Sequence, residues 1–222
     1  MNIKVREIIK TKRKTIALQI TEDADLFVKA PLDIDNKKIM EVISKHIKWI
    51  ERKKKEIETR VQKFVPKEFV NGESFLYLGR YYKLTIVNDQ EEPLKFENGF
   101  YLSKKVLDKA KEVFIEWYKN KAAEKILERV QWYAQKSGLE YNKINITNAQ
   151  KRWGSSSKKN LNFSWRLIMA PLPVIDYVVV HELSHFQEKS HGKAFWNKVK
   201  IMMPNYEKYK NWLKENGHLL KL

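Results

Sequence analysis

Three of the chain's five histidines lie between residues 181 and 191, and two of them, His181 and His185, are four residues apart. The apolar run at residues 177–180 directly precedes them and predicts a buried helix. Side chains four residues apart on a helix lie on one face, one turn above the other. The fold must therefore contain a helix whose two imidazoles point at the same spot.

His191 is the best candidate for a third imidazole at that spot. A helix that continued past His185 would rotate His191 by roughly 240°, at about 100° per residue, and carry it off the shared face. The chain must therefore turn between the two histidines, and Ser190 and Gly192 favour such a break. Zinc accepts neutral imidazole nitrogen, and its catalytic sites use three protein ligands and a water. We predict a Zn²⁺ site formed by His181, His185 and His191.

Glu182 follows the first histidine and would place its carboxylate beside the metal rather than on it. Zinc lowers the pKa of a bound water from about 15.7 to about 7. A carboxylate at this position can accept a proton from that water and deliver it to a leaving amine. The His-Glu-x-x-His pattern therefore predicts a zinc hydrolase with Glu182 as its catalytic acid and base. A structural zinc site with a fourth protein ligand, such as Glu188 or Glu207, is the alternative.

The periodicity of apolar residues elsewhere predicts an α+β fold. Alternation over residues 15–30 indicates a hairpin, and a helix follows Asp35 to about residue 60. Turn signals then mark a second β unit. A long helix runs from there to Gly138, and two strands follow around residues 144–146 and 161–165, with a turn over 154–160. We expect an N-terminal β-rich region with one helix over residues 1–102 and an α+β catalytic region over residues 103–222.

The amino-acid composition limits which metal ligands, nucleophiles and binding partners the chain can have. The chain has no cysteine, which excludes disulfides, thiolate metal ligands and a cysteine nucleophile. Its net charge of +17 favours an anionic partner such as nucleic acid. The charge is scattered, however, and glutamates flank the densest basic run, residues 52–55, which fits a solvated helix face equally well. The N-terminus lacks the apolar run of a signal peptide, and no apolar stretch approaches the roughly 20 residues of a membrane span, so we expect a cytoplasmic protein with no membrane contact.

Several stretches resemble the YgjP-like metal-dependent hydrolase family, which is related to the SprT-type and Wss-type zincins. The resemblance covers most of the chain and is strongest at residues 152–155, 161–167, 175–185 and 191–196. It implies a zincin-like metallopeptidase core that uses the same three histidines as ligands and the same glutamate as catalytic residue. Ser156 and Gly192 depart from the common family pattern, and neither belongs to the predicted metal site.

The resemblance also implies a protein or peptide substrate. In zincins a sheet edge beside the motif helix holds an extended peptide, and residues 144–153 or 161–168 would supply that edge. The scissile carbonyl would be polarised by one of four side chains, although ordinary packing explains each of them as well: Arg152, Tyr177, Tyr206 and Tyr209. We reject residues 155–157 as nucleophiles, because the clustered histidines are better used on metal. A DNA-associated metalloprotein and a non-catalytic zinc-binding scaffold are the alternative functions.

Overall fold

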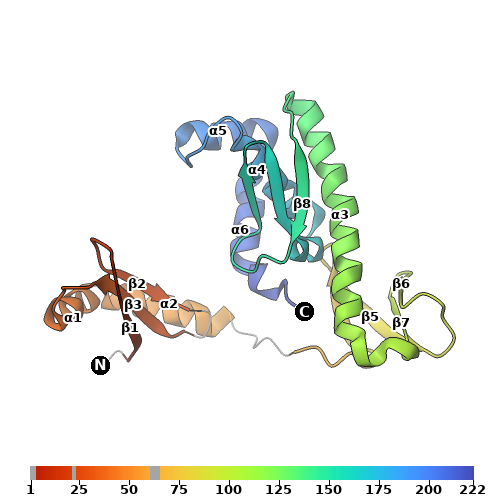
Figure 1. The fold of residues 1–222 in the computed structure, drawn as a ribbon, viewed down its shortest axis with the longest axis horizontal. Coiled ribbons are helices and arrows are strands. Elements are labelled where there is room, and N and C mark those ends of the chain that lie inside the picture. Colours follow the sequence, from red (N-terminus) through yellow and green to blue (C-terminus); the bar gives the residue numbers. More distant parts are fainter. Residues whose placement is uncertain (1–3, 22–23, 61–65) are drawn as a thin grey trace. The chain divides into compact units, whose positions relative to one another are not determined.

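The computed structural model describes residues 4–21, 24–60 and 66–222, and the chain divides into two compact units (Figure 1). Unit 1 comprises Met1–Phe64 and unit 2 comprises Val65–Leu222. Each unit has its own hydrophobic core. The mixture of helices and small sheets confirms the predicted α+β class. Among the described residues, no helix combines the length and the apolar character needed to cross a bilayer.

Unit 1 is a three-stranded sheet followed by two helices. The strands are β1 (Val5–Thr11), β2 (Ala17–Ile20) and β3 (Leu26–Pro31), in the order β1-β3-β2, and the helices are α1 (Asn36–Lys45) and α2 (Ile47–Arg60). The predicted hairpin is the antiparallel pair β2–β3, to which β1 adds in parallel. Asp35 caps α1 by accepting a hydrogen bond from the backbone N–H of Lys37, 3.3 Å away. The single helix expected here is broken at His46, where φ of −108° and ψ of 14° leave the helical region.

Unit 2 contains two sheets and a long helix between them in the chain. The first sheet has the order β4-β5-β7-β6 and consists of β4 (Ser74–Tyr77), β5 (Arg80–Val87), β6 (Leu94–Phe96) and β7 (Phe100–Ser103). A 3₁₀ turn (Lys104–Lys109) leads into the long helix α3 (Ala110–Ser137). The second sheet has the order β8-β10-β9 and consists of β8 (Lys143–Thr147), β9 (Gly154–Ser157) and β10 (Asn160–Ser164). The chain ends in the helices α4 (Leu172–Ser184), α5 (Lys193–Met202) and α6 (Tyr206–Asn216), with 3₁₀ turns at Trp165–Met169 and Gly217–Leu219.

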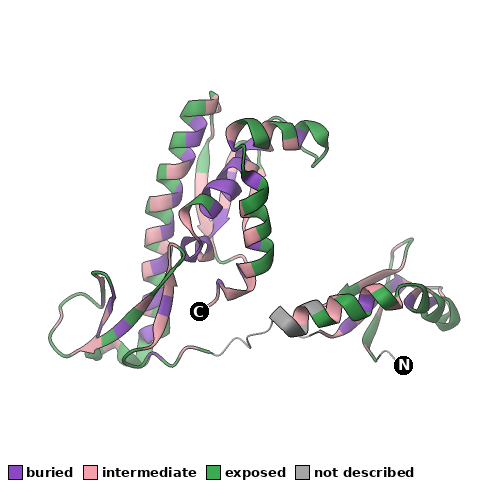
Figure 2. Ribbon diagram, turned by 180° about the vertical axis from the view of Figure 1, so that it is seen from behind, coloured by how far each residue is buried: buried purple, intermediate pink, exposed green. Residues whose placement is uncertain are grey.

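Helix α3 contacts both sheets of unit 2, and one side of it is buried along its length (Figure 2). It ends at Gly138, as predicted, because this residue adopts a left-handed φ of 63°. Near the start of α3, Phe114 stacks on Phe75 of β4 with ring centroids 4.3 Å apart, and the hydroxyl of Tyr118 donates to the carbonyl of Leu76 at 2.8 Å. These contacts bind strands β4–β7 to α3. The structure therefore divides the chain between residues 64 and 65, whereas the sequence analysis placed the division at residue 102.

The β8-β10-β9 sheet lies beside α4, the helix that carries the histidine motif (Figure 1). Strand β10 is central, parallel to β8 and antiparallel to β9, so residues 161–168 do not offer a free edge to a peptide. The other expected range, residues 144–153, begins in β8, which is an edge strand. Strand β9 is the edge that contacts α4. It occupies residues that the sequence assigned to a turn. The turn itself is shorter and consists of Lys158 and Lys159, with φ of 49° and 62°.

Candidate metal centre

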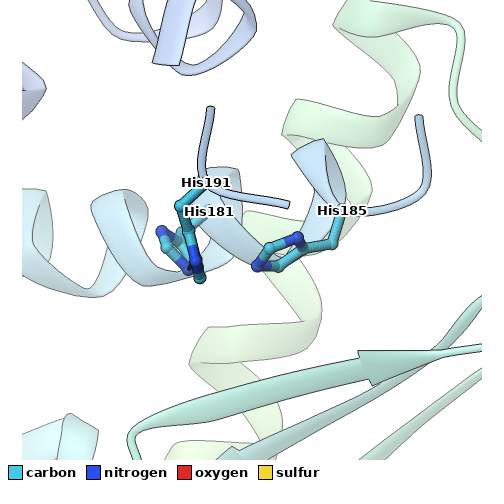
Figure 3. Close-up of side chains that lie close together, drawn as sticks. All are labelled: His181, His185 and His191. Carbon is cyan, nitrogen blue, oxygen red and sulfur yellow. Dashed lines mark hydrogen bonds between the residues drawn. The ribbon is translucent and has the colours of Figure 1, made fainter. Parts of the chain in front are cut away.

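The end of α4 brings the three predicted ligands together. His181 lies in the last turn of α4 and His185 is its C-terminal cap, while His191 precedes α5 after a short connection. One ring nitrogen from each histidine lies within 4.8 Å of the other two, and Figure 3 shows the three rings converging. The Nε2 atoms of His181 and His191 are 3.0 Å apart. The break expected after His185 is present, and it is what returns His191 to the face of the other two imidazoles.

The protonation state of these rings suits metal binding. Nδ1 of His185 lies 3.0 Å from the backbone carbonyl of Glu188, to which it must donate a proton, so the lone pair of His185 is on Nε2. Burial, together with the charges of His185 and His191, lowers the pKa of His181 to about 3. Burial also lowers the pKa of His191. His181 is therefore neutral near pH 7, and neutral imidazole nitrogen is the form that binds a metal ion.

Two aromatic side chains of α5 pack against the imidazole rings. Phe195 is fully buried, and its ring centroid lies 4.9 Å from that of His181, 4.5 Å from that of His185 and 4.8 Å from that of His191. Trp196 stacks on His191 with ring centroids 5.9 Å apart. The buried Nδ1 atom of His181 has no hydrogen-bond partner in the described part of the chain. Three imidazole nitrogens beside apolar aromatic side chains fit a zinc ion, whose preferred ligands in proteins include imidazole.

Glu182, the residue after His181 on α4, packs against strand β9. Its side chain is buried, and a Cβ atom placed on Gly154 would lie only 2.7 Å from its Oε1. Burial raises the pKa of Glu182 to about 7, although a hydrogen bond from Ser156 and the charge of Arg152 act in the opposite direction. A carboxyl group with a pKa near neutral pH can both accept and donate a proton under physiological conditions. The sequence analysis missed Gly154 and Ser156 as neighbours of this carboxylate.

The other residues considered as ligands lie outside the group formed by the three histidines. Among the described residues, the group of side chains able to hold a metal comprises the three histidines without a fourth acidic or histidine ligand. Glu188 contributes its backbone carbonyl to His185, and the carboxylate of Glu207 accepts a hydrogen bond from Tyr206 at 3.4 Å. Tyr177 is buried one turn before His181, with ring centroids 5.9 Å apart. The predicted alternative of a closed site with Glu188 or Glu207 as fourth ligand therefore finds no support in this geometry.

A helix that presents two histidines, a glutamate between them and a third histidine after a turn defines a metallopeptidase-type site. The family model of the YgjP-like metallopeptidase domain matches residues 14–216, so the chain belongs to the YgjP-like family. Among solved structures, the chain is similar to the crystal structure of the metallopeptidase zymogen of Pyrococcus abyssi abylysin. The identity is 14%, the TM-score is 0.37, and the match covers 40% of this chain and 90% of that one. A comparison with curated proteins gives no match.

Proposed function

We propose that this metallopeptidase domain is a zinc-dependent peptidase in which His181, His185 and His191 hold the metal and Glu182 is the general acid and base. The observation that carries the proposal is the convergence of three imidazole nitrogens within 4.8 Å, with a buried carboxyl group on the next residue of the same helix. Catalytic zinc sites keep one position open, whereas structural sites are filled by four protein ligands. The set of three therefore favours catalysis over a purely structural role.

The chemistry requires a proton carrier beside the metal. Zinc in a site of this kind supplies Lewis acidity, which polarises the scissile carbonyl and makes a water molecule reactive near neutral pH. Glu182 accepts a proton from that water as its oxygen bonds to the carbonyl carbon. Glu182 then delivers the proton to the amide nitrogen as the C–N bond breaks, which leaves a carboxylic acid and an amine. Its pKa of about 7 suits both transfers, because the group gives up a proton about as easily as it takes one.

The proposed substrate is an extended segment of protein. Strand β9 is an edge of its sheet, and it contacts α4, the helix that carries two of the proposed metal ligands. A free strand edge binds an extended peptide through backbone hydrogen bonds, with little dependence on the peptide's sequence. We therefore expect cleavage of unfolded proteins in preference to compact ones.

Metal removal tests this function. We expect the purified protein to bind one zinc ion per chain and to cleave unfolded casein. Treatment with a chelator should abolish the cleavage, and added Zn²⁺ should restore it, because neither Glu182 nor the histidines can replace the Lewis acid. Cleavage that continues at the same rate in metal-free protein would overturn the proposal.

A further inference from the structure

Gly154 gives strand β9 a point of close approach to α4. A Cβ atom at this position would lie 2.7 Å from Cγ and 2.7 Å from Oε1 of Glu182, and 3.0 Å from its Cδ. Such distances are shorter than van der Waals contacts between carbon and oxygen atoms, so the carboxylate occupies the space of the missing side chain. Gly154 is not among the residues with positive φ. The backbone conformation therefore accepts an ordinary residue, and the need for glycine comes from the carboxylate.

The sheet holds Gly154 at this position. Gly154 is paired with Phe163 in the β9–β10 ladder, and Phe163 is fully buried. The backbone N–H of Ser164 donates to the carbonyl of Trp153, 2.9 Å away, directly before the strand begins. Because β10 is the central strand, β9 has little freedom to move away from α4. An added methyl group at residue 154 must therefore displace the Glu182 side chain and cannot simply move the strand.

Ser156 lies on the same face of β9 as Gly154, because side chains in a strand alternate between faces. Its hydroxyl therefore faces Glu182, and hydrogen bonding by Ser156 lowers the pKa of that carboxyl, against the effect of burial. Ser155 points to the opposite face, where its hydroxyl accepts a hydrogen bond from the side-chain amide of Asn162 at 3.4 Å. A buried carboxylate needs hydrogen-bond donors to compensate for the loss of water, and Ser156 is one such donor.

We propose that Gly154 and Ser156 are positioning residues that fix the carboxylate of Glu182 for proton transfer: the glycine leaves the space and the serine sets the orientation. This inference rests on the proposed role of Glu182 as general acid and base. Proton transfer needs donor and acceptor within hydrogen-bond reach, and a misplacement of about 1 Å can cost about a hundredfold in rate. A long, otherwise flexible side chain gains that accuracy from a fixed strand.

The first test needs no catalytic activity. Gly154→Ala is made in the wild-type chain and in Glu182→Ala, and the melting temperatures of the metal-free proteins are compared. We expect Gly154→Ala to lower the melting temperature by several degrees in the wild type. The same substitution in Glu182→Ala should leave the melting temperature unchanged or raise it, because alanine is otherwise favoured over glycine in a strand. An equal loss in both backgrounds would show that residue 154 does not contact the carboxylate, and it would overturn the proposal.

The second test concerns Ser156, and Ser157 supplies a matched control because it is exposed and lies on the opposite face of the same strand. Ser156→Ala should lower kcat by about tenfold or more, the effect of losing a hydrogen bond to a charged group. KM should change by less than a factor of two, and one zinc ion per chain should remain bound. Ser156→Thr, which keeps the hydroxyl, should recover most of the rate. Ser157→Ala should behave as the wild type.

The outcomes separate this inference from the proposed function. If Glu182→Gln keeps its activity, the proposed function is wrong and the positioning role falls with it. If Glu182→Gln is inactive while Ser156→Ala matches Ser157→Ala in kcat, the peptidase mechanism stands and the positioning role of Ser156 is overturned. A loss of zinc in Ser156→Ala would also overturn it, because the residue would then act on the metal site as a whole.

Discussion

Arg129 of α3 and Asp176 of α4 form a largely buried ion pair that joins α4, the helix of His181 and His185, to the long helix α3. Nε of Arg129 donates to Oδ1 of Asp176 at 2.6 Å, and Nη2 donates to Oδ2 at 3.0 Å. The side chains are only 17% and 11% exposed. We predict that Arg129→Met strongly destabilises unit 2, because methionine keeps most of the volume but leaves the carboxylate of Asp176 buried and without its cation.

The size of the effect follows from the burial of the pair. Removing one partner of a buried ion pair costs about 3–5 kcal/mol, because the other charge is left uncompensated. A domain of this size loses roughly 2–4 °C of melting temperature per kcal/mol. The melting temperature should therefore fall by roughly 6–20 °C. Replacing both residues, as in Arg129→Met with Asp176→Leu, should recover most of that loss, since no charge then remains buried.

Thermal unfolding followed by circular dichroism measures this effect, with a chelator present so that metal binding adds no stability. The control is Lys159→Met, which removes an ion pair with Glu140 whose atoms are 3.3 Å apart but whose side chains are 52% and 87% exposed. An exposed pair contributes little, so the control should melt with the wild type. If Arg129→Met melts within a degree of Lys159→Met, the ion pair does not anchor α4 and the reasoning is wrong.

The penalty should also depend on pH in a defined direction. Burial raises the pKa of Asp176, and the hydrogen bonds and charge of Arg129 oppose that rise. In Arg129→Met these hydrogen bonds and this charge are lost. The pKa of Asp176 in the folded protein then lies still further above its unfolded value of about 3.9. The loss of unfolding free energy caused by Arg129→Met is then complete above the folded-state pKa of Asp176. It becomes smaller as the pH drops through that pKa, because the protonated acid is neutral. The stability gap between variant and wild type should close as the pH approaches about 4. A gap that stays constant would contradict this explanation.

Three further predictions concern the metal centre and the basic surface. Phe195→Ala should cost about 3–5 kcal/mol of unfolding free energy in a denaturant titration, because the ring is fully buried. The substitution should also weaken zinc binding, because this ring packs against all three imidazoles. An unchanged zinc affinity would contradict that role of Phe195. His191→Ala should lower zinc affinity by at least about a hundredfold in competition with a chelating dye, since two imidazoles remain, and a retained affinity would remove His191 from the ligand set. If the net charge of +17 serves nucleic acid, binding to DNA should weaken steeply with salt, and no binding at about 50 mM salt would exclude that role.

Helix α4, which carries His181 and His185, could be predicted because its signals are local. The apolar run before His181 indicates a buried helix, and the four-residue spacing to His185 sets the common face. The turn before His191 followed from geometry, because six further helical residues would point this imidazole away. These inferences need only a few neighbouring residues, and the structure brings the three side chains together as expected.

Strand β9 could not be predicted, because its sequence lacks the usual signals. Gly154 and the three serines after it show no alternation of apolar and polar residues, and the two-residue turn is built from lysines. Such turns with positive φ at both positions are normally recognised by Asn or Gly. What makes β9 a strand is its pairing with the buried strand β10, and what makes Gly154 important is a carboxylate from a distant helix. Both depend on contacts between segments far apart in the chain.

The two compact units divide the chain after residue 64 rather than at residue 102 for a related reason. The alternating segment from residue 74 to residue 103 has the same local character as the strands of unit 1, so the sequence grouped the two together. Contacts with α3, such as the packing of Phe75 on Phe114 and the hydrogen bond from Tyr118 to Leu76, assign this segment to unit 2. Strand β1 was missed too, because its parallel pairing with β3 leaves no pattern in the sequence of Val5–Thr11.

The most direct test of the central claim compares Glu182→Gln with the wild type, measuring zinc content and hydrolysis of unfolded casein on the same samples. Glutamine keeps the shape of the side chain but cannot carry the proton. We predict one zinc ion per chain in both proteins and a rate at least about a hundredfold lower in the variant, which is the usual contribution of a general acid and base. A variant that binds zinc and hydrolyses casein at the wild-type rate would contradict the proposed mechanism.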